Sequence, residues 1–273
     1  MHEISIIMVV YDGDNDIHFK DSLNSLLVNS NFYSELILVI NGEISEFKNR
    51  LIRQLKNDLK IKPIFLQKNI GLAKALNIAC NNVKYQWIAR FDSDDLNSPD
   101  RFFKIQNYIS KYGNDFDVMG TYIIEFVSEL TDKKKLIRKV PLKMNEIKKR
   151  LIFRNPMNHV SVFFKRKIIE ENNYYPLIDG FEDYAFWTKL IYKGYRFKNF
   201  KDITVFVRTG SGMIKRRGGL DYIFKEIKLR IFFMKYFEIY ILPLNLLSFI
   251  IRVILFSLNS KIKKYIYLFI RKF

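Results

Sequence analysis

Cysteine is nearly absent from the sequence, and its scarcity excludes two kinds of protein. Cys80 is the single cysteine among 273 residues, so the chain cannot form an internal disulfide framework or a cysteine-rich zinc site. The residues around Cys80 follow a helical pattern, in which a small buried side chain is the expected role for this thiol.

Glycine-rich phosphate loops are also missing. No Gly-x-Gly-x-x-Gly segment follows the first apolar run, Ile4–Val10, and the sequence contains no Walker-type lysine loop. Hydride transfer with a dinucleotide and ATP hydrolysis therefore lose most of their support. No basic segment or small-residue cleavage site accompanies this N-terminal run, so we expect no secretory signal and a cytoplasmic protein.

What is present is a large apolar fraction and an excess of positive charge. Hydrophobic residues make up 49% and aromatic residues 16% of the chain, which favours a folded protein with one substantial core. The formal net charge is +18, and residues 201–273 contribute 15 Lys and Arg against 4 Asp and Glu. A nucleic acid or an anionic membrane would attract such a surface. Because the cations gather beside an apolar tail and not along an aromatic groove, the pattern favours the membrane.

Strand-like and helix-like patterns alternate through the first two thirds of the chain. Each predicted strand is a short apolar run, and each predicted helix repeats apolar residues every three or four positions. Buried strands that are each followed by a helix predict an α/β fold, with a parallel sheet between two layers of helices. The predicted strands are 4–11, 35–40, 61–66, 85–91 and 160–164, and the predicted helices are 17–28, 47–59 and 72–81.

Three polar turns follow predicted strands, at the edge of a parallel sheet where ligands bind. Tyr11–Asp14 follows the first strand, Asn41-Gly42 the second and Asp92–Asp95 the fourth. An aromatic ring beside a carboxylate suits a nucleobase, and paired carboxylates suit ribose hydroxyls and a metal-bridged diphosphate. Turns are polar in any case, so Asn41-Gly42 alone fits a plain turn equally well.

Asp92, Asp94 and Asp95 crowd one turn, and two interpretations are open. Three carboxylates at the mouth of a buried strand repel one another, which favours a cation that neutralises them. The alternative is a solvated acidic turn ahead of a helix that Ser98 or Asp100 caps.

Four ordered segments give the chain a family resemblance. From about residue 5 to residue 208 it resembles the family 2 glycosyltransferases, and within them the bacterial exopolysaccharide and O-antigen branch typified by amylovoran-type enzymes. The resemblance implies a GT-A fold with a mostly parallel sheet, a nucleotide-sugar donor, a divalent cation and inversion at the anomeric carbon. The segments that carry it are Ser5–Tyr11, Asn69–Asn77, Ala89–Asp95 and Gly180–Trp187.

The resemblance also implies roles on the donor side. Asp94 is expected to bind the cation, Mn²⁺ or Mg²⁺, and Asp92 the ribose or the same cation, with Asp95 supporting them indirectly. Many members of the family carry an acid where this chain has Asn41, so this contact lacks the usual charge. The implied nucleotide-sugar-binding residues are Tyr11, Asp12, Asn41, Asn69, Lys74, Arg90 and Asp92.

On the acceptor side, the resemblance places the catalytic base in Glu182-Asp183. We expect Asp183 to accept the proton of the acceptor hydroxyl, and Glu182 to orient the acceptor or Asp183. An unperturbed aspartate has a pKa of about 3.9 and is a weak base, so proton transfer should be late and the site dry. The alternative is that both acids merely open a helix, whose positive end favours them.

Two further groups are candidates for contact with the acceptor or the diphosphate. His159 matches a recurring position in this branch, but a lone histidine beside a strand is as often structural. Lys215, Arg216 and Arg217 lie in a glycine-rich segment that is either a cover for the diphosphate or a basic loop facing a membrane.

The sequence predicts a catalytic domain and a membrane-associating tail. We expect residues 1–219 to form the GT-A domain, with a donor half to about 115 and an acceptor half over 116–219, and residues 220–273 to form basic, apolar helices. Residues 239–258 could span a bilayer, but Pro243, Asn245 and Arg252 favour lying in the interface. The alternatives are helices that pack on the core or form a dimer seam, and the sequence does not predict an oligomeric state.

Together these features predict an inverting enzyme at the inner face of a bacterial cell membrane. It would move a hexose or N-acetylhexosamine from a nucleotide sugar, with UDP the expected nucleotide, to a glycan or polyprenyl-diphosphate-linked acceptor in surface polysaccharide synthesis. A basic membrane-associated or nucleic-acid-binding protein on a non-catalytic transferase fold is the rival hypothesis. A sugar-nucleotide pyrophosphorylase would carry a basic glycine-rich loop after the first strand, where this chain has an acidic turn.

Overall fold

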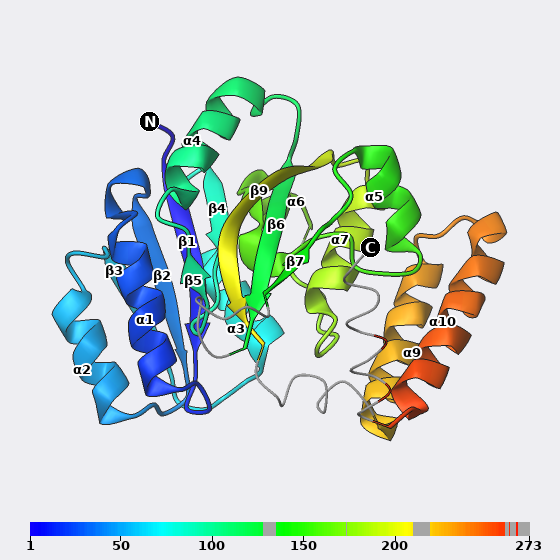
Figure 1. Ribbon diagram of the computed structural model, residues 1–273, viewed down its shortest axis with the longest axis horizontal. Helices are drawn as coiled ribbons and strands as arrows, with labels where there is room; N and C mark the ends of the chain where they lie inside the picture. Colours follow the sequence, from blue (N-terminus) through cyan, green and yellow to red (C-terminus); the bar gives the residue numbers. More distant parts are fainter. Residues whose placement is uncertain (128–134, 173, 210–218, 260–261, 263–265, 267–273) are drawn as a thin grey trace.

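The computed structural model describes residues 1–127, 135–172, 174–209, 219–259, 262 and 266 (Figure 1). In this part of the chain nine strands form one sheet, in the order β3-β2-β1-β4-β8-β6-β9-β5, with β7 paired to β6. The sheet runs through both predicted halves of the catalytic domain. The boundaries at 115/116 and 219/220 stay predictions.

The first half of the sheet is parallel, as the sequence predicts. Strand β1 pairs with β2 on one side and with β4 on the other, and β2 pairs with β3. The four carboxyl ends therefore meet at one edge of the sheet. These strands are β1 (Ile4–Val10), β2 (Glu35–Asn41), β3 (Ile61–Leu66) and β4 (Trp87–Arg90).

The second half of the sheet is mixed. Strand β8 runs antiparallel to both β4 and β6, whereas β6 and β9 are parallel and form the longest pairing in the sheet. The short strands β5 and β7 add antiparallel pairs to β9 and β6. The strands are β5 (Leu96–Asn97), β6 (Val118–Phe126), β7 (Leu136–Arg138), β8 (Phe163–Lys165) and β9 (Phe197–Arg208).

Alternation along β1 divides the apolar core into two layers, one on each face of the sheet. Ile6 and Met8 face helices α1, α2 and α4, while Ile7 and Val9 face α3, α5, α6, α7 and α9. Cys80 is buried in the second layer, and burial raises the pKa of its thiol. The helices are α1 (Asp16–Leu27), α2 (Glu46–Leu55), α3 (Leu72–Asn81), α4 (Arg101–Tyr112), α5 (Met144–Leu151), α6 (Lys167–Asn172) and α7 (Glu182–Tyr192).

Two helices near the C-terminus form a hairpin at one end of the molecule (Figure 1). Helix α9 (Leu220–Met234) packs against α7, with Leu229 and Phe233 in the core, and α10 (Leu242–Ser257) packs against α9. Residues 239–257 are long and apolar enough to cross a membrane, with a mean hydropathy of 2.2, and only 11% of them are buried. In the described part of the tail, α9 thus packs on the core, and much of α10 is exposed.

Candidate active site at the carboxyl ends of the parallel strands

The turns after β1 and β4 are joined by Asp14. Its Oδ2 accepts hydrogen bonds from the Tyr11 backbone N–H at 3.1 Å and from the Ser93 hydroxyl at 2.7 Å. Burial raises the pKa of Asp14, and the charge of Asp92 adds to the effect. The sequence pattern did not single out this carboxylate, because its partner lies 79 positions away along the chain.

The turns after β2 and β3 are joined by two asparagines. The Asn41 side chain donates from Nδ2 to Asn69 Oδ1 at 3.0 Å and accepts from the Ile70 N–H at 2.9 Å. An aspartate at position 41 has no N–H to donate, so the amide suits this loop better than an acid. Gly42 has a φ of +94°, and a β-carbon there would lie 2.9 Å from the backbone nitrogen of Asn69.

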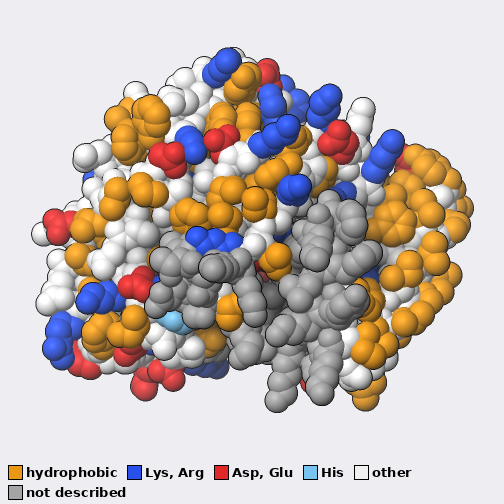
Figure 2. All heavy atoms as spheres, in the orientation of Figure 1, with side chains coloured by type: hydrophobic (Ala, Val, Ile, Leu, Met, Phe, Trp, Pro, Cys, Tyr) orange, Lys and Arg blue, Asp and Glu red, His pale blue; other side chains and the backbone are white. Residues whose placement is uncertain are grey.

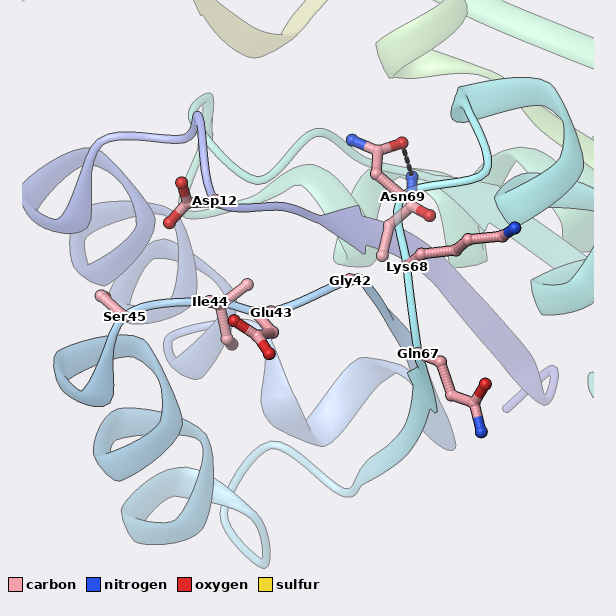
Figure 3. Close-up of a pocket in the computed structure, with 9 residues that line it drawn as sticks. Asp12, Gly42, Glu43, Ile44, Ser45, Gln67, Lys68 and Asn69 are labelled. Atoms are coloured by element: carbon pink, nitrogen blue, oxygen red, sulfur yellow. Dashed lines mark hydrogen bonds between the residues drawn. The ribbon is translucent and has the colours of Figure 1, made fainter.

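A pocket of about 460 Å³ lies between these two turns (Figure 3). Three predicted donor-binding residues line it, namely Asp12, Asn41 and Asn69. The other predicted residues of the β1 turn and of α3, Tyr11 and Lys74, are exposed and do not line it. Gly42 of the predicted turn also lines it, and the lining residues that the sequence analysis missed are Glu43, Ile44, Ser45, Gln67 and Lys68.

The acidic turn after β4 has three carboxylates in different environments. Asp92 is 39% exposed, and Asp95 is buried, where its Oδ1 accepts from the Arg208 N–H at 2.8 Å. Burial raises the pKa of Asp94 to about 6, and the charges of Asp92 and Asp14 contribute. Strand β5 separates this turn from α4, so the three acids do not cap that helix.

Arg90 is buried at the end of β4 and binds the acidic turn. Its guanidinium donates to the Asp92 carboxylate and to the Phe91 carbonyl. Burial acts to lower the pKa of Arg90, but the charge of Asp92, followed by Tyr175 and Glu182, outweighs it and raises the pKa. Arg90 therefore lies between the donor-side acids and the start of α7.

Arg101 has a structural role beneath this site. Its guanidinium donates to the carbonyl oxygens of Arg90 at 2.7 Å and Val160 at 3.0 Å. Burial, with the charge of Arg90 next, lowers its pKa to about 9. These bonds hold the end of β4 in place, and Arg101 does not reach the surface.

The first turn of α7 presents the predicted catalytic pair. Asp183 is partly exposed, and its two carboxylate oxygens accept from Asn155 Nδ2 at 2.6 Å and from the Tyr184 N–H at 2.7 Å. Glu182 is only 6% exposed. Burial raises its pKa to about 7, and the charge of Asp183 adds to the shift. Glu182 thus holds a proton under conditions in which an ordinary glutamate is charged.

His159 lies behind this pair in an aromatic setting. Its Nε2 is 3.1 Å from the Tyr175 hydroxyl, and its ring packs against Trp187. Burial, with the charge of Arg90 second, holds its pKa well below the usual range. His159 is therefore a neutral, positioned side chain. Tyr175, which the sequence analysis missed, is held in turn by backbone hydrogen bonds to Asn77.

The family model for glycosyl transferase family 2 matches residues 5–224 of the chain. The chain belongs to this family. It is 33% identical over 233 residues to the UDP-Gal:alpha-D-GlcNAc-diphosphoundecaprenol beta-1,3-galactosyltransferase of Escherichia coli, an alignment that covers 85% of this chain and 84% of that protein.

A second relative and a solved structure agree with this assignment. The amylovoran biosynthesis glycosyltransferase AmsE of Erwinia amylovora is 30% identical over 226 residues, which cover 82% of this chain and 83% of AmsE. The crystal structure of S. aureus TarS 1–349 in complex with UDP-GlcNAc matches with a TM-score of 0.69 at 17% identity, over 90% of this chain and 72% of that one. The GT-A fold and the family predicted from the sequence are confirmed.

The side chains of the acidic turn in this family 2 glycosyltransferase are of the kind that binds a divalent cation. Asp94 offers a partly exposed carboxylate whose neighbours repel its charge, which a cation would relieve. Asp92 is already paired with Arg90. Across the described ranges, no three His, Cys, Asp or Glu side chains are grouped to hold a metal by themselves, so further oxygen ligands would have to come from the diphosphate, from water or from backbone carbonyls.

The predicted site residues of the glycosyltransferase lie in separate groups. Asp12, Asn41 and Asn69 line one pocket, Arg90 pairs with Asp92, and Glu182 and Asp183 lie together in the first turn of α7. Three predicted residues, Lys215, Arg216 and Arg217, lie outside the described residues.

Proposed function

We propose that this glycosyltransferase transfers a hexose or N-acetylhexosamine, with inversion, from a UDP-sugar to a lipid-linked glycan acceptor in bacterial surface polysaccharide synthesis. The observation that carries the proposal is the buried Arg90, which pairs with the donor-side Asp92 at the carboxyl edge of the parallel strands. The two relatives support the class of donor and acceptor. The E. coli enzyme is named for UDP-Gal and a diphosphoundecaprenol acceptor, and AmsE is named for amylovoran biosynthesis.

The donor would bind along the carboxyl edge of the parallel strands. The pocket between the β2 and β3 turns is large enough for a nucleoside, and Asn41 and Asn69 give it a fixed floor. Asp12 at its rim is an acceptor for a base or ribose hydrogen. The diphosphate would then extend toward the acidic turn, where Arg90 already neutralises Asp92.

The reaction would be a single displacement in which Asp183 takes the proton. The acceptor hydroxyl oxygen forms a bond to the anomeric carbon, and the bond from that carbon to the diphosphate oxygen breaks with its electron pair. The hydroxyl proton passes to the Asp183 carboxylate, which Asn155 and the Tyr184 N–H hold in one orientation. Glu182, protonated below about pH 7, orients the acceptor as a hydrogen-bond donor.

Asp94 would hold a divalent cation, with Asp92 as a shared contact. When bound, Mn²⁺ or Mg²⁺ supplies charge stabilisation to the departing diphosphate. All candidate ligands are oxygens, which both ions accept. Independently of the ion, Arg90 supplies one fixed positive charge at the same edge of the sheet.

A donor screen tests the proposal. Purified full-length protein is titrated with UDP-galactose, UDP-glucose, their N-acetyl forms and GDP-mannose, with and without Mn²⁺ or Mg²⁺, and binding and slow donor hydrolysis are measured. We expect one UDP-sugar to bind most tightly when the ion is present. If no nucleotide sugar binds under either condition, the proposed function is wrong.

We further propose that the protein lies peripherally on the inner face of the cell membrane through α10. Figure 2 shows apolar side chains gathered at the edge of the molecule where α10 lies. Lys228 of α9 and Lys235, which directly follows this helix, are exposed and suit anionic headgroups. The exposed apolar residues of α10 are Leu244, Leu246, Leu247, Ile250, Ile251 and Ile254.

Surface variants of the full chain test this location, because removing α9 would take Leu229 and Phe233 out of the core. We expect a variant with Leu247, Ile250 and Ile254 changed to Asn to lose flotation with vesicles of phosphatidylglycerol and phosphatidylethanolamine. The control changes two exposed apolar residues far from α10, Val28 and Phe65, to Ser. Equal flotation of both variants would contradict the location.

A further inference from the structure

Arg252 belongs to the most apolar helix of the protein, yet its side chain does not face outward. It is 20% exposed, and its Nε lies 3.0 Å from Oε1 of Glu226 on α9. The exposed face of α10 consists of leucine and isoleucine side chains, so Arg252 occupies the opposite, packed face. Because the charge of Arg252 lies on the packed side of this helix, it needs a partner inside the protein.

The partners of Arg252 include two residues at the start of α7. The Arg252 guanidinium lies 5.8 Å from the ring centroid of Phe181 and 6.0 Å from that of Tyr184. These two aromatic residues immediately flank Glu182 and Asp183. A planar cation over aromatic faces is attracted by the ring electrons and restricts how the rings move.

A buried charge cluster fixes the guanidinium in this place. Glu226 is fully buried, and its Oε1 also pairs with Arg230 at 2.7 Å. Arg230 in turn donates to Asn245 Oδ1 at 2.9 Å and to the Ile152 carbonyl at 3.0 Å. Because a buried carboxylate needs its cations, Arg252 cannot rotate away from Glu226 without cost.

The same helices support both partners of the hydrogen bond between Asn155 and Asp183. On one side, Tyr184 packs edge-on against Phe233 of α9 at 5.0 Å, with its hydroxyl bonded to the Leu151 carbonyl at 2.5 Å. On the other side, the bond from Arg230 to Ile152 holds the chain three residues before Asn155. The α9–α10 hairpin thus contacts the chain segments on both sides of this bond.

We infer that Arg252 is a positioning residue for the catalytic pair, and that α10 serves the transfer step as well as any membrane contact. The inference rests on the proposed role of Asp183. Arg252 contacts the aromatic rings on either side of the pair. It acts through Phe181 and Tyr184, which set the direction of the first turn of α7.

The experiment compares three full-length variants. Arg252→Met keeps the length and removes the charge, and Arg252→Lys keeps the charge for Glu226 but loses the planar group over the rings. Ile109→Ala is the stability control, because Ile109 is a buried residue of the other core layer, across the sheet from α7 and α9. Each is measured for kcat of transfer, donor KM, Tm and amide hydrogen exchange over residues 180–187.

We expect Arg252→Met to lower kcat by about tenfold or more with donor KM unchanged, since small misplacements of a catalytic group are costly. Exchange over residues 180–187 should quicken in this variant. The kcat and the exchange rate of Arg252→Lys should lie between those of Arg252→Met and the wild type. If Arg252→Met does not fold, Arg252→Lys is the variant that tests the inference. Ile109→Ala should lower Tm while leaving kcat and this exchange unchanged.

Two outcomes would overturn the inference. One is a loss of activity that follows Tm equally in all three variants, and the other is a wild-type kcat in both Arg252 variants. If the wild-type protein transfers no sugar, the proposed function fails, and hydrogen exchange alone still reports whether Arg252 orders the first turn of α7. Unchanged exchange in Arg252→Met would then reject the positioning role.

Discussion

Asn155 donates a hydrogen bond of 2.6 Å to Asp183 Oδ2, across 28 positions of the chain. The other carboxylate oxygen of Asp183 accepts from the Tyr184 N–H. The carboxylate of the proposed base is therefore oriented by the protein before any acceptor binds.

Asp183→Asn should abolish transfer while leaving donor binding intact. The amide keeps the shape of the side chain but cannot accept the proton, and a general base contributes about 10²- to 10⁴-fold to a rate. Transfer kinetics and calorimetric titration of the donor measure the two properties. Asp179→Asn, an exposed acid four positions earlier, is the control. Turnover of Asp183→Asn near the wild-type rate would remove this residue from the mechanism.

Asn155→Ala should lower kcat by roughly tenfold to a hundredfold, because a hydrogen bond to a charged group is worth about 1.5–3 kcal/mol. Donor KM should stay constant, since Asn155 does not line the donor pocket. Steady-state kinetics at saturating acceptor check this. Asn81→Ala removes an amide that binds a tyrosine on the surface and should have no effect. A rise in donor KM without a change in kcat would contradict the orienting role.

Asp94→Asn should weaken the gain in donor affinity that Mn²⁺ provides by at least about tenfold. Loss of the carboxylate removes the proposed cation ligand, while Asp92 remains paired with Arg90. Calorimetric titration of the donor with and without the ion measures this difference, and Asp115→Asn at an exposed position serves as control. An undiminished gain in the Asp94 variant would place the ion elsewhere.

Glu182→Gln should make stability less dependent on pH. Burial, and then the charge of Asp183, raise the pKa of Glu182 from 4.5 to about 7. Between these values the folded state holds a proton that the unfolded state has released, so the free energy of unfolding falls as the pH rises. Above pH 7 the variant should be more stable than the wild type by up to roughly 3 kcal/mol, and below about pH 4.5 the gain should vanish.

Urea denaturation from pH 4 to pH 8 measures this difference. Glu3→Gln, which changes an exposed glutamate, should show the wild-type pH dependence. A parallel pH dependence of wild type and Glu182→Gln would mean that Glu182 is charged in the folded protein at neutral pH.

The first half of the fold could be predicted from the sequence, and much of the second half could not. Strands β1 to β4 are apolar runs separated by helical patterns, so local periodicity locates them within about two residues. Strands β5 and β7, of two and three residues, have no periodicity to detect. They exist because β9 and β6 offer them backbone partners.

The candidate site shows the same division. Asp12, Asn41 and Asn69 follow strands whose ends meet, so their shared pocket could be predicted from strand order alone. Asn155 and Tyr175 carry no local signal, because each acts through a partner distant in the sequence. Glu43 follows the Asn41-Gly42 turn directly, and this adjacency was the one signal by which it could have been found.

Arg252 and Asn245 show most clearly what the sequence determined and what only the tertiary structure determined. By itself the sequence determined the parallel strands, the acidic turn and an apolar C-terminal segment, because each depends on residues close together in the chain. It also carried the motifs that place the protein in its family. Only the tertiary structure decided that these two polar residues face α9 and not a membrane surface, because Arg252 pairs with Glu226 and Asn245 accepts a hydrogen bond from Arg230, both on α9.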